Sequence, residues 1–221
     1  VGNQIAETLI IHDHSLNRRS ARTQAEEMLA QLGIPDPTRM SRRYPHELSG
    51  GMSQRIMIAM MLVTSPKLLI ADEPTSALDV TIQAQILELI KELIREIKTS
   101  VLMITHDLGV MAETCDRVAI MYAGDMVEMG SVRSVLKDPQ HPYTQGLLQT
   151  VPDKANPEQP LFSIKGNVPS LLEPQTSCRF APRCDFVMDR CKREIPPFFM
   201  LNGDHQAACF LHDGQSEVQA G

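Results

Sequence analysis

Two short apolar runs interrupt the mixed hydrophobic and polar positions of the chain, at Leu68–Ala71 and Ser100–Thr105. Continuous rather than alternating runs of this length are typical of strands buried on both faces of a parallel sheet. Between them, Thr81–Lys98 has apolar residues at helical spacing from Ile82 to Ile97 and charged residues on the opposite side. This pattern predicts an amphipathic helix between two buried strands.

Further elements are predicted on both sides of this segment. The preceding residues favour three helices: one from Val1, one over about Ser20–Gln31 that stops at Gly33, and one over the apolar run Ile56–Val63, capped by Ser49. The following residues favour a helix to about Thr114, a strand Arg117–Tyr122, a turn, a hairpin partner Met126–Met129, and helices over Val132–Leu136 and from His141 through Leu148.

The alternation of strands and helices up to residue 122 predicts an α/β fold. The composition then changes, because Pro152–Pro160 contains three prolines and several polar residues, which is typical of a linker. The tail from Leu161 is rich in proline, weakly periodic, and holds four of the five cysteines. We therefore expect an α/β domain followed by a small extension rich in cysteine and proline.

Length and charge narrow the function classes. The 221 residues suffice for one good core and a small appendage. A net charge of −6 argues against a broad nucleic-acid-binding surface. The longest apolar stretch, Ile56–Val63, is far shorter than the roughly 20 residues that cross a bilayer. We expect any membrane association to come through partner proteins.

Asp72 and Glu73 directly follow the first apolar run. Ligands of parallel sheets bind at the carboxyl ends of the strands, so two adjacent acids there suggest a metal-assisted reaction. One carboxylate would hold the ion and the other would act on a water molecule. The alternative for an isolated acidic pair is a strand that ends in a solvated turn.

Two other stretches carry chemical signals. Ser49, Gly50 and Gly51 precede the predicted helix over Ile56–Val63, where backbone N–H groups and the helix dipole favour an anion. Taken alone, this Ser-Gly-Gly could equally be a turn and a cap. His106 follows the second apolar run, and its alternatives are a catalytic role and a capping or core histidine.

The motifs LSGGMSQR (Leu48–Arg55), LLIADEPTSALD (Leu68–Asp79) and ITHD (Ile104–Asp107) occur in this order. Together they resemble the signature, Walker B with D-loop, and H-loop motifs of the ATPase subunit of an ATP-binding-cassette (ABC) transporter. The resemblance implies the α/β fold of the C-terminal part of an ABC-type P-loop ATPase domain, with ATP and Mg²⁺ as cofactors.

The resemblance also implies a role for each motif residue. Asp72 would hold Mg²⁺ through its water shell, Glu73 would polarise the attacking water, and His106 would contact the γ-phosphate. Asp79 would lie at a dimer interface as well as capping the helix that follows it. The signature residues would reach across a head-to-tail dimer to the ATP of the partner subunit: Ser49, Gly50, Gly51 and Gln54.

One departure limits the resemblance. None of the twelve glycines is followed by lysine, so the GxxxxGK[ST] phosphate loop is absent from these residues, as is the glutamine loop expected ahead of the first helix. Both precede the signature in the family, so the chain resembles a fragment whose front part is missing. We expect this polypeptide alone to hydrolyse ATP negligibly, because it lacks the backbone cradle and lysine for the phosphates.

The tail resembles one subfamily. His141–Leu148 (HPYTQGLL) and Cys178–Cys184 (CRFAPRC) are similar to the C-terminal extension of oligopeptide and dipeptide importers. The resemblance implies a partial ABC ATPase domain over residues 1–140 and the oligopeptide-transporter extension over 141–221. Alternatives are an importer of nickel or another small solute, a non-transport ABC ATPase, and a tail that acts as an independent redox or metal-binding module.

The resemblance further implies an ATPase that powers peptide import at the cytoplasmic face of the cell membrane. Its expected partners are a second ABC ATPase subunit (in a homo- or heterodimer), two integral-membrane permeases and an extracytoplasmic solute-binding protein. No nucleic-acid partner is expected.

Cys178, Cys184, Cys191 and Cys209 are clustered in the tail, which favours metal binding over disulfides. Four thiolates satisfy an iron–sulfur cluster or a zinc ion, although the spacing departs from the CxxC pairs of structural zinc sites. The resembled family can carry a [4Fe–4S] cluster on this pattern. A structural cluster, a zinc ion and plain thiols remain the alternatives.

Overall fold

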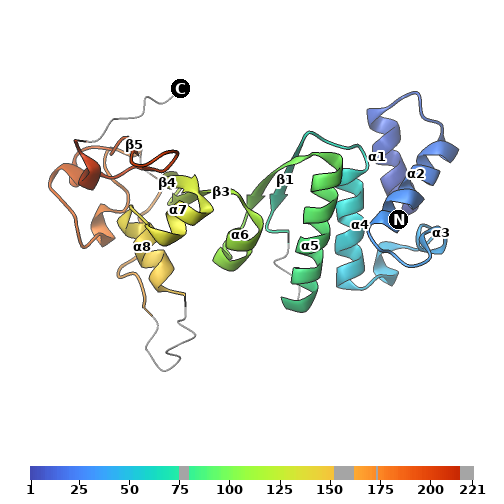
Figure 1. Cartoon of the computed structure of the whole chain (residues 1–221), viewed down its shortest axis with the longest axis horizontal. Coiled ribbons are helices and arrows are strands. Elements are labelled where there is room, and N and C mark those ends of the chain that lie inside the picture. The colour runs from blue at the N-terminus through green and yellow to red at the C-terminus, as the bar shows by residue number, and fades with distance from the viewer. Residues whose placement is uncertain (75–79, 152–161, 173, 215–221) are drawn as a thin grey trace. The chain divides into compact units, whose positions relative to one another are not determined.

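The computed structural model describes residues 1–74, 80–151, 162–172 and 174–214, without the side chains of 80–82 and 93. The chain divides into two compact units, Val1–Val110 and Met111–Gly221 (Figure 1). These two units are defined by how compactly their residues pack, and their boundary differs from the domain boundary predicted from the sequence. The assignment of 1–140 to an ATPase domain and of 141–221 to an extension concerns family, and it stays a prediction.

Helices dominate the first half of unit 1, as predicted. They are α1 (Gly2–His12), α2 (Arg18–Gln31), the short α3 (Pro37–Met40) and α4 (Gly50–Leu62), with the 3₁₀ helix η1 (Pro45–Glu47) before α4. Their apolar faces meet in one core, which α5 also joins (Figure 1). Its most buried side chains include Ile5, Leu29, Leu32, Ile58, Leu62 and Ile86.

The helix boundaries follow from local capping chemistry. Asn17 precedes α2, and its side chain accepts a hydrogen bond from the Ser20 amide at 2.9 Å. Gly33 follows α2 with a φ of +66°, a left-handed conformation that glycine adopts without a steric penalty. Ser49 caps α4, because its Oγ accepts from the Met52 amide at 3.4 Å.

A parallel strand pair completes unit 1. β1 (Leu68–Asp72) and β2 (Ser100–Ile104) pair in register from Leu68 opposite Ser100 to Asp72 opposite Ile104. The amphipathic α5 (Val80–Ile97) connects them and runs beside α4 (Figure 1). α6 (Leu108–Thr114) follows β2, and Asp107 caps it by accepting from the amides of Gly109 and Val110.

The prediction that both strands are buried on both faces is wrong for this structure. Leu69 and Val101 pack into the helical core on one face. On the other face Leu68, Ile70, Leu102 and Ile104 are 48–58% exposed, because α4 and α5 cover one side of the pair only. Parallel sheets are normally covered on both faces. The open face is therefore a large apolar surface.

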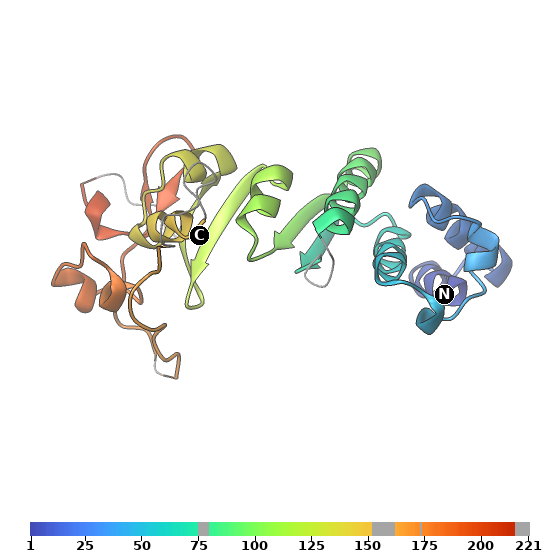
Figure 2. The same cartoon turned by 90° about the horizontal axis from the view of Figure 1, so that it is seen from below.

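Unit 2 is built on an antiparallel sheet in the order β3–β4–β6–β5. β3 (Arg117–Tyr122) and β4 (Asp125–Ser131) form the predicted hairpin, yellow-green in Figure 2. Ala123 and Gly124 form its turn, both with positive φ, as a two-residue turn that matches the strand twist requires. The two-residue strands β5 (Phe199–Met200) and β6 (Gln206–Ala207) add a second hairpin that sequence periodicity did not indicate.

Short helices surround this sheet. α7 (Val132–Lys137) and α8 (Pro142–Gln149) confirm the two predicted helices, and the tail adds η2 (Ala181–Arg183), η3 (Arg190–Lys192) and η4 (Phe210–His212). Tyr122, Tyr143 and Phe180 pack as an aromatic cluster with ring centroids 4.7–5.5 Å apart. Across the described residues of the whole chain, every helix is too short or too polar to span a bilayer.

Candidate functional site

The carboxyl ends of β1 and β2 bring two predicted site residues into contact. Glu73 Oε1 lies 2.9 Å from His106 Nδ1, so the imidazole can donate a hydrogen bond to the carboxylate. The pair is exposed, with 46% of the Glu73 side chain and 76% of the His106 side chain accessible. An exposed pair of this kind contributes little to folding stability, at most about 1 kcal/mol. Both side chains are therefore accessible to a ligand.

The backbone at Glu73 is in an unusual conformation. Its φ is +44°, in the left-handed region, and its amide donates to the Ile104 carbonyl at 2.9 Å. A non-glycine residue held there costs about 1–3 kcal/mol, and such positions cluster at functional sites. The ladder hydrogen bond fixes this conformation, which turns the side chain toward His106 from the adjacent strand end.

The remaining residues of the acidic motif are only partly described. Asp72 ends β1 with an exposed side chain, one residue before Glu73. Asp79 lies outside the described residues, and its predicted roles stay predictions. Gln54, on α4, donates from Nε2 to the Pro74 carbonyl, which ties the signature helix to the segment directly after the acids.

The signature residues begin α4, as the sequence predicts. Ser49 is the N-cap, and Gly50 and Gly51 form the first helical positions. A Cβ added at Gly50 would meet nothing within 4 Å, so this end of the helix is open to an approaching molecule. An exposed helix N-terminus of this kind can accept an anion, but the structure does not bring Ser49–Gly51 into contact with Glu73 or His106.

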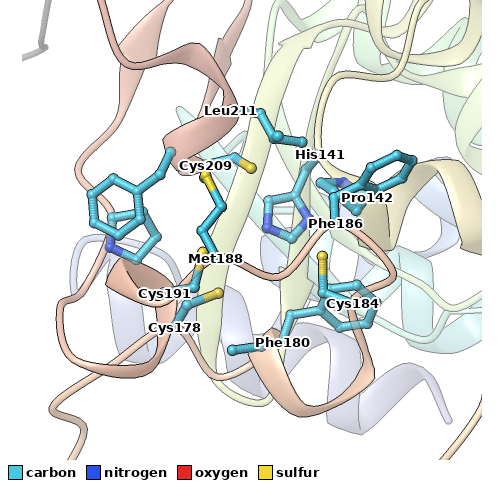
Figure 3. A pocket seen from close by; sticks show the side chains of 13 residues that line it. His141, Pro142, Cys178, Phe180, Cys184, Phe186, Met188, Cys191, Cys209 and Leu211 are labelled. Carbon is cyan, nitrogen blue, oxygen red and sulfur yellow. The ribbon is translucent and has the colours of Figure 1, made fainter.

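A second candidate site lies in unit 2. Cys178, Cys184, Cys191 and Cys209 line one pocket together with His141 and apolar side chains such as Phe186 and Met188 (Figure 3). All five cysteines of the chain are free thiols, and Cys115 does not line this pocket. The structure thus brings together the four cysteines that the sequence singled out.

Burial sets the protonation of these thiols. It raises the pKa of Cys178 and Cys184, and it raises the pKa of Cys209 to about 11, with further contributions from the neighbouring cysteines. Backbone amides act in the opposite direction, because the N–H groups of Phe180 and Ala181 donate to Cys178, that of Phe186 to Cys184 and that of Leu211 to Cys209. Cys178, Cys184 and Cys209 are therefore neutral thiols at neutral pH, and backbone N–H groups already donate to their sulfurs.

The described side chains around the pocket do not form a ready site for a single metal ion. The described His, Cys, Asp and Glu side chains include no group of three placed to hold a single metal ion. One zinc ion needs all four sulfurs within about 2.3 Å of one point.

His141 connects the pocket to a buried polar network. Its ring is 2% exposed, and Nδ1 accepts from the Tyr143 amide at 3.0 Å, which caps α8. Burial, together with the charge of His212, lowers the pKa of His141 to about 4, so the ring is neutral at physiological pH.

Glu128 on β4 is the centre of this network. Its side chain is fully buried and accepts from the Gln140 amide at 2.8 Å, from the His141 amide at 2.9 Å and from His205 Nε2 at 2.7 Å. One carboxylate thus joins the sheet, the start of α8 and the β5–β6 hairpin. Sequence reasoning missed Glu128, His205 and the position of His141. A glutamate within an otherwise mainly apolar strand was the only available signal.

Family models match two segments of the chain. The model described as "ABC transporter" matches residues 3–76, and that of the "Oligopeptide/dipeptide transporter, C-terminal region" matches residues 127–191. The two matched segments contain the signature and acidic motifs and three of the four pocket cysteines.

Similar curated proteins cover nearly the whole chain. A probable peptide ABC transporter ATP-binding protein, y4tR of Sinorhizobium fredii, is 53% identical over 95% of this chain and 63% of that protein. The dipeptide transport ATP-binding protein DppD of Bacillus subtilis is 48% identical over 98% of this chain and 64% of that protein. The oligopeptide transport ATP-binding protein AppD of Bacillus subtilis is 46% identical over the whole chain and 67% of that protein.

The chain belongs to the family of peptide ABC transporter ATP-binding proteins. It spans about two thirds of the length of these relatives.

Solved structures agree with this family on the fold. CbiO1 of Clostridium perfringens, part of the ABC transporter complex cbiONQ, has a TM-score of 0.54 and 28% identity over 62% of this chain and 53% of that one. An inward-facing putative metal-chelate type ABC transporter has a TM-score of 0.55 at 24% identity, over 66% of this chain and 56% of that one. The predicted α/β class, as the C-terminal part of an ABC-type ATPase, is confirmed.

We predict that Glu128→Gln strongly destabilises unit 2. The amide group would place a donor against the amide N–H or His205 N–H that Glu128 now accepts from, so buried polar groups would lose their partners. Breaking a buried pair from one side costs about 3–5 kcal/mol. Urea unfolding, monitored by the hydrogen exchange of backbone amides in unit 2, measures this decrease in the free energy of unfolding.

The exposed Glu88→Gln is the matched control, because Glu88 pairs with Lys91 on the surface of α5. It should change the free energy of unfolding by less than about 0.5 kcal/mol. An equally small effect of Glu128→Gln would show that the network does not hold unit 2 together.

Proposed function

We propose that this chain is the ATP-hydrolysing part of a subunit that powers the import of oligopeptides or dipeptides. The observation that carries the proposal is the 2.9 Å contact between Glu73 and His106 at the carboxyl ends of two parallel strands. The names of the relatives, which are peptide, dipeptide and oligopeptide transport proteins, support the substrate class.

Each residue of the site then has a chemical role. Glu73 accepts a proton from the water that attacks the γ-phosphate. Asp72, one residue earlier on the strand, holds the water shell of Mg²⁺, an ion that supplies charge neutralisation at the phosphates when it is bound. Asp79 serves the dimer interface.

His106 links the base to the phosphate. Its Nδ1 is engaged by Glu73, which leaves Nε2 as the atom that can reach a phosphate oxygen. The same contact orients the Glu73 carboxylate toward the phosphate.

The signature residues serve a second subunit. Ser49, Gly50 and Gly51 lie at an open helix N-terminus, which suits a phosphate delivered by a partner copy or a related ATPase subunit. Gln54 holds this helix to the backbone after the acids, so movement of the signature and of the acidic segment is coupled. Hydrolysis would then depend on closure of the dimer.

The open face of β1 and β2 fits this view. Exposed Leu68, Ile70, Leu102 and Ile104 form an apolar surface that water does not favour. We propose that in the whole subunit a further layer covers this face and contributes the phosphate loop that these residues lack. The greater length of the relatives leaves room for such a layer.

The assembly follows from the same proposal. Residues 1–140 belong to the ATPase domain and 141–221 form the extension. The subunit binds two integral-membrane permeases at the cytoplasmic face of the cell membrane and works with an extracytoplasmic binding protein, without nucleic acid. The cbiO1 structure, described as part of a transporter complex, supports such an arrangement.

We further propose that Cys178, Cys184, Cys191 and Cys209 hold a [4Fe–4S] cluster. Four free thiols on one pocket and the backbone donors to their sulfurs support it. Cys184, Cys191 and Cys209 lie on or next to the short helices η2, η3 and η4, so a cluster would join these helices. Its role would be structural.

The ATPase proposal is tested with a chimera in which this chain replaces the matched residues of the Bacillus subtilis protein DppD. The chimera should hydrolyse ATP and restore dipeptide uptake to cells that lack DppD. The isolated 221-residue chain should show negligible turnover, because it has no phosphate loop. Restored nickel uptake without dipeptide uptake would contradict the peptide assignment. ATP turnover by the isolated chain would contradict the proposal that these residues hold only part of the catalytic site.

The cluster proposal is tested by metal removal and analysis. The chain purified without oxygen should contain about four irons and four acid-labile sulfides, and chelation of iron should lower its melting temperature. Cys191→Ser should lose the cluster, whereas Cys115→Ser, outside the pocket, should retain it. Zinc in place of iron, or a metal-free protein of equal stability, would disprove the cluster.

A further inference from the structure

Cys178 and Cys191 are neighbours in the cysteine pocket, and their backbones are hydrogen-bonded. The Cys178 amide donates to the Cys191 carbonyl at 3.0 Å. A backbone bond of this kind holds the two Cα atoms about 5–6 Å apart, within the range of about 4.4–6.8 Å that a disulfide spans. Both side chains also pack in one small apolar cluster with Phe199 and Phe210. The fold thus brings two free thiols to disulfide spacing.

The other two pocket cysteines are held differently. The Cys184 amide donates to the Ala181 carbonyl at 3.3 Å, within its own turn, and Cys209 belongs to the separate segment that precedes η4. Figure 3 shows Cys178 and Cys191 side by side, with Cys184 and Cys209 on other parts of the pocket wall. Of the four cysteines, Cys178 and Cys191 are therefore the pair that the backbone already positions.

The two thiols differ in accessibility. Cys178 is half-buried and Cys191 is 8% exposed, so a small oxidant in solution meets Cys178 first. The N–H groups of Phe180 and Ala181 donate to the Cys178 sulfur, which favours the thiolate, the form that reacts. Burial acts in the opposite direction and raises the pKa of this thiol, so its oxidation is slow at neutral pH.

We propose that Cys178 and Cys191 form a modification site, at which a peroxide converts the two thiols into a disulfide. The Cys178 sulfur attacks one oxygen of hydrogen peroxide, becomes a sulfenic acid and releases the other oxygen as water. The Cys191 sulfur then attacks this sulfenic sulfur, which forms the S–S bond and releases a second water. The two thiols lose two electrons, and the peroxide gains them.

The disulfide would fasten the residues before η2 to η3 and would consume two of the four pocket thiols. A disulfide between Cys178 and Cys191 and a metal site of all four cysteines therefore exclude each other. The proposal concerns the metal-free chain and does not rest on the cluster proposed above. It makes the tail a part of the chain that responds to oxidants.

The test exposes the 221-residue chain, freed of metal with a chelator in the absence of oxygen, to hydrogen peroxide. Free thiols are then blocked, and the digested chain is analysed by mass spectrometry. Peptide 166–179 should be joined to peptide 191–192 about tenfold more often than any other two, because a held pair has a high effective concentration. Trypsin makes this readable, since each cysteine falls on a peptide of its own: 99–117, 166–179, 184–190, 191–192 and 194–221.

Two variants and one reference condition show whether the fold directs the pairing. Cys184→Ser is the matched control, because it removes a different pocket thiol and should retain the linkage. Cys191→Ser should abolish it. In concentrated urea the pairs closer in sequence, Cys178 with Cys184 and Cys184 with Cys191, should predominate, because shorter loops close more readily.

The proposal is overturned if another pair is the main product in the folded chain, if the mixture equals that in urea, or if Cys178 and Cys191 stay reduced. Failure of the cluster or of the ATPase proposal does not affect it, since the assay reads only thiol pairing in the metal-free chain.

Discussion

Parallel pairing of β1 with β2 is the constraint on which the acidic site depends. The register places Asp72 opposite Ile104, so Glu73, directly after β1, and His106, two residues after β2, emerge at the same edge. One further ladder bond, from the Glu73 amide to the Ile104 carbonyl, holds Glu73 in a left-handed conformation and brings its carboxylate to His106. Residues 33 positions apart thereby become a single reactive pair. The hydrogen bonds between the two strands offset the conformational energy of the left-handed backbone at Glu73.

Unit 2 depends on a different interaction, the threefold acceptance of hydrogen bonds by the buried Glu128 carboxylate. It fixes the start of α8, and thus the orientation of the His141 ring toward the cysteines. It also holds His205, and with it the hairpin that leads to Cys209. The tail is therefore ordered by these polar contacts together with buried apolar side chains such as Phe180, Phe199 and Phe210.

Much of the fold could be predicted from the sequence, because local signals were strong. Ser49 and Gly33 marked helix ends, the apolar period marked α5, and Ala123–Gly124 marked the hairpin. The prediction that both faces of β1 and β2 are buried was wrong. An apolar run indicates that a strand favours burial, but it does not show which part of the protein packs against each face. The β5–β6 hairpin was missed because two-residue strands carry no period.

The candidate site, like the fold, has some features that could be predicted from the sequence and others that could not. Site residues that are adjacent in the chain, such as Asp72 and Glu73, could be predicted from their residue types and their position after an apolar run. The contact between Glu73 and His106 was not predicted, because the resemblance implied only that both residues act near the γ-phosphate, and the structure supplies its geometry. The convergence of Glu128, His141 and His205 could not be predicted, because it joins three segments that share no sequence pattern.

The central claim is that Glu73 acts as the base for ATP hydrolysis, and its most direct test is Glu73→Gln in the DppD chimera. Glutamine keeps the shape of the side chain and its contact with His106 but cannot accept the proton. ATP turnover should fall by a factor of about 10²–10⁴ while ATP binding persists, and Glu88→Gln should be unchanged. Full turnover by Glu73→Gln would contradict the account.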